Sequence, residues 1–544
     1  MKTLLLLAGV FLCFTAIGQN RSNHFQNPVI SGFHPDPSVC RVGDDYYLAT
    51  SSFQYWPGIP VFHSKDLVNW KPIGHCITRK SQADLSGIAS SDGLWAPTLR
   101  YHDGVFYMIV SNVQRSPWKP VNFFVTATDP AGPWSEPVFV EEGTGIDPDL
   151  FFDDDGKAYY LRNDSKGIVL SEIDLSTGDL IGEFHTLWGG TGAPHPEAPH
   201  LYKIDDYYYL VLAEGGTGPY HRSTIARSKH LTDGYKAYPF NPILGHIERF
   251  EHPIQATGHG DLIQAHDDSW WFFFLAKRSN SFESFNSVLG RETFLAPVRW
   301  THDEWPVIGN RGHVEPTMEG PDFYTPKSEK FVFRDDFEDE NPGLHWNFLR
   351  YPRKENYSRD TRSGQLILQG DSLSLDDVGS PTFVGVRQKH FDCTVTTSME
   401  FNPVESTDEA GVAVYMEEKH YCSIGLTLRN GQHTVVVHAR VGNLKGELGS
   451  ISVDSGNVFF KVVASEDYYR FYCSEDQEIW HFAGEMETRY LEPPQYTGMY
   501  LGLYATGNGN VSKEPSKFNW FEYREELSQK CKIKLVHPVS KESL

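Results

Sequence analysis

A unit that recurs five times over the first three hundred residues constrains the fold of this chain more than any other feature. Each unit starts with a short apolar strand, crosses a turn rich in Gly and Asp, and continues into a strand rich in aromatic residues. This order of segments is typical of a β-hairpin. The units recur at intervals of about 50 to 60 residues, which indicates a repeat architecture. They start at 36–39, 96–99, 147–150, 198–201 and 260–263.

A second hairpin follows the first in each unit, for example at 61–70, 124–130 and 225–231. Two hairpins make a four-stranded blade, and five blades make a five-bladed β-propeller, which protects its strand edges by radial repetition. The first strand of each blade then lines a central channel, so residues at the strand starts converge on one place. A β-sandwich built from the same hairpins is the alternative, but five similar units fit poorly into two sheets.

The pattern changes after Pro306. Residues 313–330 are rich in Pro, Glu, Gly and Lys, and alternating runs such as 411–415 and 433–438 follow. Short alternating strands separated by polar turns predict a two-sheet sandwich of the concanavalin A-like or jelly-roll type. We therefore expect an all-β chain. Its parts are a signal peptide at 1–18, a propeller at 19–321, a linker at 322–332, a β-sandwich at 333–525 and a polar tail at 526–544.

The N-terminus has the pattern of a cleaved signal peptide. Lys2 supplies a positive charge, residues 4–17 are apolar, and Ala16-Ile17-Gly18 places small residues before a cleavage point at Gln19. The apolar run is shorter than the roughly 20 residues that a membrane-spanning helix needs. We expect export to the periplasm or the extracellular space, with no membrane insertion. Beyond Cys13 the cysteines are scattered without a CxxC motif, so buried free thiols are expected.

Charge limits the partners. The formal net charge is −23, and a field of this sign repels nucleic acid and anionic lipid surfaces. A neutral oligosaccharide or polysaccharide is compatible with it. Aromatic residues reach 14% of the chain, and most are expected in strand cores. Some of their rings are free to stack on sugar faces. The composition leaves the oligomeric state open.

Three acidic residues stand at or near strand starts: Asp36, Asp147 and Glu197. A propeller brings them to the same end of the channel. Hydrolysis of a glycosidic bond needs one ionised and one protonated carboxyl group. A third, ionised carboxylate nearby raises the pKa of the acid by like-charge repulsion. An Asp before Pro is more often a turn residue, so the prediction depends on convergence of the three.

The contexts of these acids resemble glycoside hydrolase family 43. Matching segments include 27–38 around the first Asp, 145–150 around the second and 196–201 around the Glu. The likeness continues through 51–58, 94–97, 213–217, 258–261 and 289–293. The region from 334 onwards is similar to the accessory domain of the family's β-xylosidases. The resemblance thus covers nearly the whole chain after the signal peptide and implies a five-bladed propeller with an inverting mechanism.

The resemblance implies a role for each acid. Asp36 is the general base that activates water, Glu197 is the general acid, and Asp147 sustains the raised pKa of Glu197. The base and the acid of an inverting pair lie roughly 6.5–9.5 Å apart, which leaves room for the water. Asp149 stands where the family has Ser, so two carboxylates compete for the third role. We favour Asp147 because it lies at the strand start.

Substrate contacts follow by position in the same motifs. Phe53 and Trp95 match aromatic residues that shape the subsite of the terminal sugar. Arg291 matches the cation that binds its hydroxyl groups, and a pairing with Glu292 is the structural alternative. His259 matches a channel histidine that in many relatives holds an ordered water or a structural Ca²⁺ at the propeller axis. No cofactor is required by the predicted chemistry.

The resemblance implies an exo-acting enzyme that releases terminal β-D-xylose from xylo-oligosaccharides or xylan. An α-L-arabinofuranosidase acting on arabinoxylan, or an enzyme with both activities, is the second reading, because the two sugars present similar hydroxyl groups. Two further classes remain. One is a retaining fructan-type hydrolase with Asp36 as nucleophile, whose family opens with a different motif. The other is a sugar-binding propeller without catalysis, which would lack one of the carboxylates.

Overall fold

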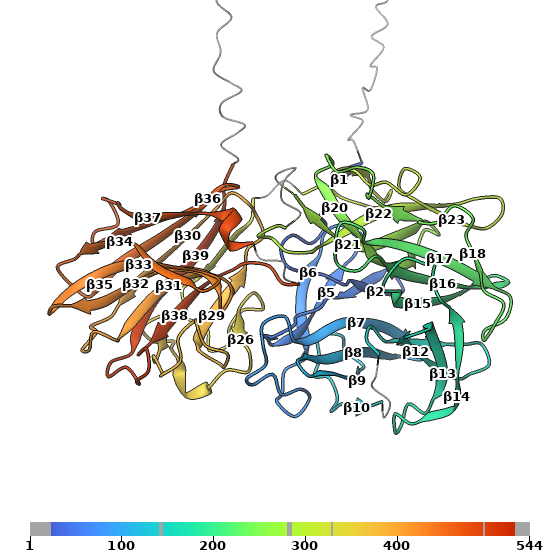
Figure 1. Cartoon of the computed structure of the whole chain (residues 1–544), viewed down its shortest axis with the longest axis horizontal. Helices are drawn as coiled ribbons and strands as arrows, with labels where there is room; N and C mark the ends of the chain where they lie inside the picture. The colour runs from blue at the N-terminus through green and yellow to red at the C-terminus, as the bar shows by residue number, and fades with distance from the viewer. Residues whose placement is uncertain (1–22, 141–144, 280–285, 328–329, 493–495, 528–544) are drawn as a thin grey trace, which may run out of the picture.

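The computed structural model describes residues 23–140, 145–279, 286–327, 330–492 and 496–527. The expected signal peptide and most of the expected polar tail lie outside these residues. Two all-β domains stand side by side (Figure 1), with the N-terminal one in blue to green and the C-terminal one in yellow to red. In the described part of the chain, no helix has the length and apolar character needed to cross a membrane.

The N-terminal domain is a propeller of five blades, which confirms the prediction and excludes the sandwich alternative for this region. Four blades are four-stranded sheets, and the fourth blade carries one additional short strand. The first two blades comprise β2 (Ser38–Val42), β3 (Asp45–Ala49), β5 (Gly58–Ser64) and β6 (Lys71–Ile77), then β7 (Gly93–His102), β8 (Val105–Arg115), β9 (Trp118–Ala127) and β10 (Val138–Phe139). The other three comprise β11 (Asp149–Phe152), β12 (Ala158–Asp164), β13 (Gly167–Ile173) and β14 (Leu180–Trp188), then β15 (Glu197–Ile204), β16 (Tyr207–Glu214), β17 (Arg222–Ser228), β18 (Lys236–Ala237) and β19 (Leu244–Gly245), then β20 (Ile254–Gln264), β21 (Trp270–Arg278), β22 (Glu292–Trp300) and β23 (Pro306–Ile308).

One residue at the start of each blade has a left-handed backbone. L-residues seldom adopt this conformation, and such strain gathers at functional sites. In this propeller it recurs at the same point of every unit, immediately before or within the innermost strand. The five residues and their φ angles are Asp36 (55°), Ala96 (46°), Asp147 (56°), Ala198 (52°) and His259 (50°). The repeat seen in the sequence is therefore also a repeat of backbone conformation.

The two ends of the propeller are joined directly. β1 (His24–Gln26) pairs antiparallel with β24 (Thr317–Glu319), which follows the fifth blade. The chain leading into the first blade is also bonded to the fifth, because the His34 amide donates to the Arg291 carbonyl at 3.0 Å. The first and last blades are thereby closed into a ring.

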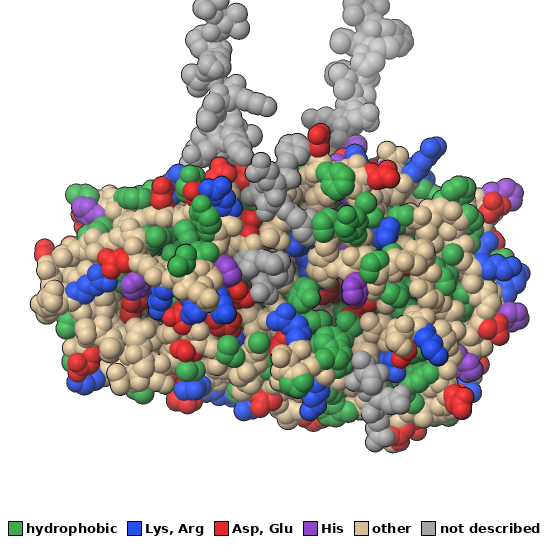
Figure 2. All heavy atoms as spheres, viewed as in Figure 1, with side chains coloured by type: hydrophobic (Ala, Val, Ile, Leu, Met, Phe, Trp, Pro, Cys, Tyr) green, Lys and Arg blue, Asp and Glu red, His purple; other side chains and the backbone are tan. Residues whose placement is uncertain are grey.

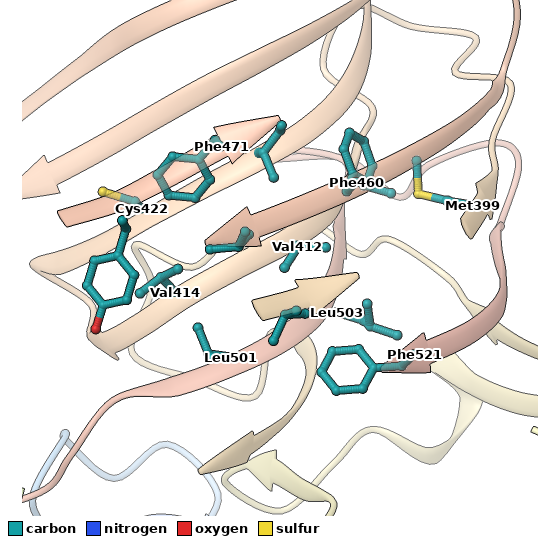
Figure 3. Close-up of a cluster of buried hydrophobic side chains, with 14 of the residues drawn as sticks. Met399, Val412, Val414, Cys422, Phe460, Phe471, Leu501, Leu503 and Phe521 are labelled. Carbon is teal, nitrogen blue, oxygen red and sulfur yellow. The ribbon is translucent and has the colours of Figure 1, made fainter. Parts of the chain in front are cut away.

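The C-terminal domain consists of two eight-stranded antiparallel sheets. Apolar side chains from both sheets meet between them (Figure 3), among them Val412, Phe460 and Leu503. One sheet comprises β25 (Val332–Asp335), β27 (Tyr357–Asp360), β28 (Gln365–Leu368), β30 (Cys393–Glu400), β35 (Asn457–Ala464), β36 (Tyr468–Ser474), β37 (His481–Glu487) and β39 (Ser516–Glu525). The other comprises β26 (Asn347–Leu349), β29 (Thr382–Arg387), β31 (Glu409–Glu417), β32 (His420–Arg429), β33 (Gln432–Val441), β34 (Leu444–Ser452), β38 (Tyr500–Thr506) and β4 (Tyr55–Trp56), with the short 3₁₀ turns η1 (Lys354–Asn356) and η2 (Thr488–Leu491) between strands.

One strand of this second sheet comes from the propeller. β4 leaves the first blade and pairs with β26, with Trp56 opposite Phe348. Beside it the fully buried Arg350 forms an ion pair with Glu418 and donates to the backbone of the propeller residue Ile88. A shared sheet and a buried ion pair therefore hold the sandwich against the propeller.

The five cysteines of the described residues are free and buried, as expected. They are distributed over both domains: Cys40, Cys76, Cys393, Cys422 and Cys473. The surface view (Figure 2) shows acidic and basic side chains interspersed over both halves of the molecule. On the face shown, the charges of both signs are mixed rather than gathered in one patch.

Candidate active site

A pocket of about 350 Å³ opens at the end of the propeller channel where the innermost strands begin. All five blades contribute to its wall, and among the described residues of the sandwich Tyr496 also lines it. The seven residues singled out from the sequence all line it: Asp36, Phe53, Trp95, Asp147, Glu197, His259 and Arg291. Residues up to 255 positions apart, such as Asp36 and Arg291, are thus neighbours in one small space.

Asp36 is held as an ionised carboxylate. It is buried, but it accepts hydrogen bonds from Arg291 Nη1 at 2.9 Å and from Ser51 Oγ at 2.6 Å, and His259 Nδ1 lies 3.5 Å away. Burial alone raises the pKa of Asp36, but Arg291, His259 and Ser51 together outweigh burial and lower it. A carboxylate that stays ionised and bonded on both oxygens is suited to accept a proton from water.

Glu197 and Asp147 have the opposite character. Burial, followed by the charge of Asp36, raises the pKa of Glu197 to about 7, with Arg291 opposing in part. Burial, followed by repulsion from Glu197 and Asp36, raises the pKa of Asp147, although the amide of Ala198 donates to it. Two such carboxyl groups release their protons as a coupled pair, so one proton is retained to high pH. Glu197 can therefore be protonated while Asp36 is ionised.

Aromatic rings form one side of the pocket. The ring of Phe53 lies 5.6 Å from that of Trp95 and 6.1 Å from that of Tyr496, centroid to centroid. The backbone carbonyl of Tyr496 also accepts from Nε and Nη2 of Arg291, at 3.3 and 3.2 Å. Trp118, which is 53% exposed, stands at the rim next to Trp95. Tyr496 was not expected, because nothing in its local sequence marks a residue of another domain as part of this pocket.

Asp149 lies outside the pocket, one layer further along the channel. Arg100 lies in this layer, with Nη2 at 2.9 Å from Asp149 Oδ1 and Nη1 at 3.2 Å from Asp261 Oδ2. Nη2 is also 2.9 Å from Nδ1 of His200. The layer consists of the buried residues two positions after each left-handed residue: Ser38, Thr98, Asp149, His200 and Asp261. Asp147 therefore faces the pocket, whereas Asp149 belongs to an axial ion-pair network.

The residues at the axis do not fit a calcium site. Calcium takes six to eight oxygen ligands. Next to His259 the nearest carboxylate is Asp36, which is already paired with Arg291. The axial carboxylates Asp149 and Asp261 are paired with a guanidinium group. Within the described ranges, no three His, Cys, Asp or Glu side chains are grouped so that they could hold a metal ion.

Comparison with known proteins agrees with this geometry. Residues 25–306 match the family model of glycosyl hydrolases family 43, and residues 334–524 match that of the β-xylosidase C-terminal concanavalin A-like domain. A non-reducing end α-L-arabinofuranosidase of Bacteroides ovatus is 40% identical over 532 residues, which cover 96% of this chain and 98% of that protein. A xylosidase/arabinosidase of Butyrivibrio fibrisolvens is 35% identical over 522 residues, covering 92% of this chain and 99% of that protein.

Solved structures lead to the same family. The crystal structure of xylan β-1,4-xylosidase from Bacillus halodurans superposes with a TM-score of 0.88 at 33% identity, covering 92% of this chain and all of that one. A Bacteroides ovatus xyloglucan-locus protein of the family superposes with a TM-score of 0.88 at 40% identity, with the same coverage. Each of the two domains therefore matches its own family model, and the solved structures cover both domains. The protein is a glycoside hydrolase and belongs to glycosyl hydrolases family 43.

Proposed function

We propose that this protein is an exo-acting, inverting glycosidase that releases a terminal pentose from xylo-oligosaccharides or xylan. The observation that carries the proposal is the pair of carboxyl groups in opposite states. Asp36 is ionised by its contact with Arg291, whereas Glu197 has a pKa of about 7 in the same pocket. This difference is what acid–base hydrolysis of a glycoside needs. A sugar-binding propeller without catalysis would not require it.

The chemistry follows from these two groups. Asp36 accepts a proton from a water molecule, whose oxygen attacks the anomeric carbon. Glu197 donates its proton to the glycosidic oxygen as the bond to the leaving group breaks. Attack on the face opposite the leaving group inverts the configuration. Asp36 then releases its proton and Glu197 regains one from solvent. Asp147 is the partner of Glu197 in holding this proton, because the two neighbouring carboxyl groups disfavour being ionised together.

Exo action is supported by the wall of the pocket. Tyr496 stands beside Phe53 and Trp95, and the sandwich that carries it is bound to the propeller through β4. A pocket of about 350 Å³ with a wall on one side holds a terminal sugar more readily than the middle of a chain. Trp118 at the rim is available to the next sugar. Arg291 can donate to substrate hydroxyl groups as well as to Asp36.

The first candidate substrate is a β-D-xyloside, because xylosidases recur among the similar proteins. The second is an α-L-arabinofuranoside, favoured by the 40% identity to the Bacteroides ovatus arabinofuranosidase. Paired hydrolysis of 4-nitrophenyl β-D-xylopyranoside and α-L-arabinofuranoside compares kcat/KM for the two. The anomer released first is read by NMR. If the protein hydrolyses neither compound, the proposed substrate class is refuted. If the product released first has the retained anomeric configuration, the inverting mechanism is refuted and a retaining fructan-type reaction is favoured.

We propose further that Arg100 supplies the positive charge at the propeller axis, so that no calcium is needed there. Its guanidinium group pairs with Asp149 and Asp261, which come from the third and fifth blades. Activity should be unchanged by EDTA and by added Ca²⁺, whereas Arg100→Met should lose most of it. Loss of activity in EDTA that calcium restores would contradict this proposal.

We also propose that the chain is exported after removal of residues 1–18. The support is the pattern of Lys2, the apolar segment 4–17 and the small residues before Gln19. Expression of the full chain in a bacterial host, followed by N-terminal sequencing of the periplasmic protein, tests the cleavage point. A cytoplasmic product that keeps Met1 or Lys2 would contradict export.

A further inference from the structure

A small cavity lies at the junction of the two domains, separate from the active-site pocket. Its volume is about 20 Å³. The first blade contributes His34 and Phe62 to its wall, and the sandwich contributes Phe331, Arg387 and Lys389. A cavity must have about 10–15 Å³ to hold a single water-sized particle. The space therefore fits one water molecule or one monatomic ion, and it is too small for a sugar or a phosphate.

Arg387 reaches this cavity with an incomplete set of partners. The side chain is only 6% exposed. Its Nη1 donates to Asn347 Oδ1 at 2.6 Å, whereas Nε and Nη2 are buried without a hydrogen-bond partner among the described residues. The guanidinium group otherwise packs on the rings of Phe33 and Tyr500, at 5.7 and 5.5 Å from their centroids. Two nitrogen atoms, with three N–H groups between them, are thus left over in a dry environment.

Lys389 adds a second positive charge to the same cavity. Its Nζ lies 4.2 Å from the centroid of Phe331. Within the part of the chain that the structure describes, no carboxylate forms an ion pair with Lys389 or Arg387. The contrast is Arg350 at the same domain junction, which has Glu418 as its partner. Of the buried arginines at this junction, Arg387 is the one whose charge is not compensated by an acid in the described residues.

The surrounding histidines record the same positive field. Burial, followed by the charge of Arg387, lowers the pKa of His75 to about 3. Burial, followed by Lys389 and Arg387, lowers the pKa of His345 to about 3. Burial, followed by the charges of Arg387 and Lys389, also lowers the pKa of His34. The histidines are neutral at neutral pH, so the uncompensated charge is that of the arginine and the lysine. Burying such a charge without a counter-charge is costly.

We propose that this cavity binds one small inorganic anion, with chloride as the natural candidate, between Arg387 and Lys389. The anion accepts from Nε and Nη2 of Arg387 and neutralises charge that the described side chains leave unpaired. Because the wall belongs to both domains, the bound anion ties the propeller to the sandwich. A water molecule would accept hydrogen bonds from Arg387 but would not neutralise the positive charge of Arg387 and Lys389. An experiment that varies the anion can therefore distinguish the two occupants.

The site is connected to the active-site pocket by packing. Arg387 covers Phe33, whose ring lies 5.7 Å from that of Phe53 in the pocket wall. His34, on the cavity wall, is two residues before Asp36 and is bonded through its carbonyl to Thr293 Oγ1 at 2.6 Å. Loss of the anion is therefore expected to loosen the domain junction next to the catalytic base.

The first test measures thermal unfolding of the full chain in sodium chloride against sodium gluconate at equal ionic strength. A ligand that binds only the folded protein raises the midpoint once its concentration exceeds the dissociation constant. The unfolding midpoint should rise with chloride and not with gluconate. Lys389→Met should weaken the apparent chloride affinity at least tenfold, and Arg387→Met should abolish the effect. Arg470→Met, at a partly exposed arginine whose partner is Glu485, is the matched control and should keep it.

The second test does not depend on the folding of a variant. Crystals of the wild-type protein grown in sodium bromide should show an anomalous peak within hydrogen-bond distance of Arg387 Nε and Nη2. No peak there, together with identical midpoints in chloride and gluconate, would overturn the proposal. That outcome would assign the cavity to a water molecule, or to a carboxylate from outside the described residues.

Discussion

The state of Glu197 leads to a prediction about stability as well as about activity. Its pKa in the folded protein is about 7, against an ordinary value of 4.5. Each pKa unit corresponds to about 1.36 kcal/mol, so ionising Glu197 costs up to about 3 kcal/mol more in the folded than in the unfolded chain. The folded state binds this proton more tightly. The contribution of Glu197 to the free energy of unfolding is therefore fully present below about pH 4.5. It falls as the pH rises and is lost above about pH 7.

Glu197→Gln removes the ionisation and keeps the shape of the side chain. The free energy of unfolding, measured in urea at pH 4.5, 6 and 8, should rise relative to wild type by up to about 3 kcal/mol between the lowest and highest pH. The side chain faces the pocket and is partly wetted, so this figure is an upper bound. Activity should be lost at every pH.

The exposed Glu405→Gln is the matched control for the loss of one carboxylate. It should leave the pH dependence of stability as in wild type. A Glu197→Gln protein whose stability difference from wild type is the same at all three pH values would refute the raised pKa and the reasoning built on it. Equal activity of the variant and the wild type would refute the role of Glu197 as acid.

Three further predictions concern the site and the domain junction. Asp147→Asn removes the carboxyl group that shares a proton with Glu197, so the last proton leaves at lower pH and the basic limb of kcat/KM should move about one pH unit lower; a limb that does not move would remove Asp147 from this role. Tyr496→Ala opens the pocket wall, and loss of one ring contact worth about 0.5–1.5 kcal/mol should lower kcat/KM for xylobiose roughly three- to tenfold. Unchanged kinetics would contradict the contact. Arg350→Met leaves Glu418 buried without its cationic partner and should cost about 3–5 kcal/mol in urea unfolding, most of which the double variant with Glu418→Met should recover; strictly additive losses would argue against the pair.

The propeller was accessible from the sequence because its evidence is local and repeated. Strand, turn and aromatic strand follow one another within about a dozen residues, and this order recurs in five units. A radial fold then places equivalent positions around one axis, so Asp36 and Asp147 could be brought together without any knowledge of contacts. Tyr496 could not be found in this way, because it belongs to the other domain and to no repeat.

The competition between Asp147 and Asp149 shows where local reasoning ends. The two residues are separated only by Pro148; Asp149 is the first residue of β11, and Asp147 lies just before that strand. The backbone turn at Asp147 sends one side chain to the pocket and leaves the other beside Arg100. Which of two carboxylates two positions apart faces the substrate depends on the direction of the side chains and on a partner from another blade.

The sequence by itself determined the all-β class, the five blades, the second domain and the set of carboxyl groups that share one site. These follow from periodicity and from the geometry of repetition, which are properties of the chain. Only the tertiary structure decided which carboxyl group is ionised, how the sandwich closes the pocket, that a guanidinium group lies at the axis, and that no acid of the described residues pairs with the buried Arg387. Those outcomes depend on burial and on charges brought from distant parts of the chain, because the energy of a charge is determined by its surroundings in space.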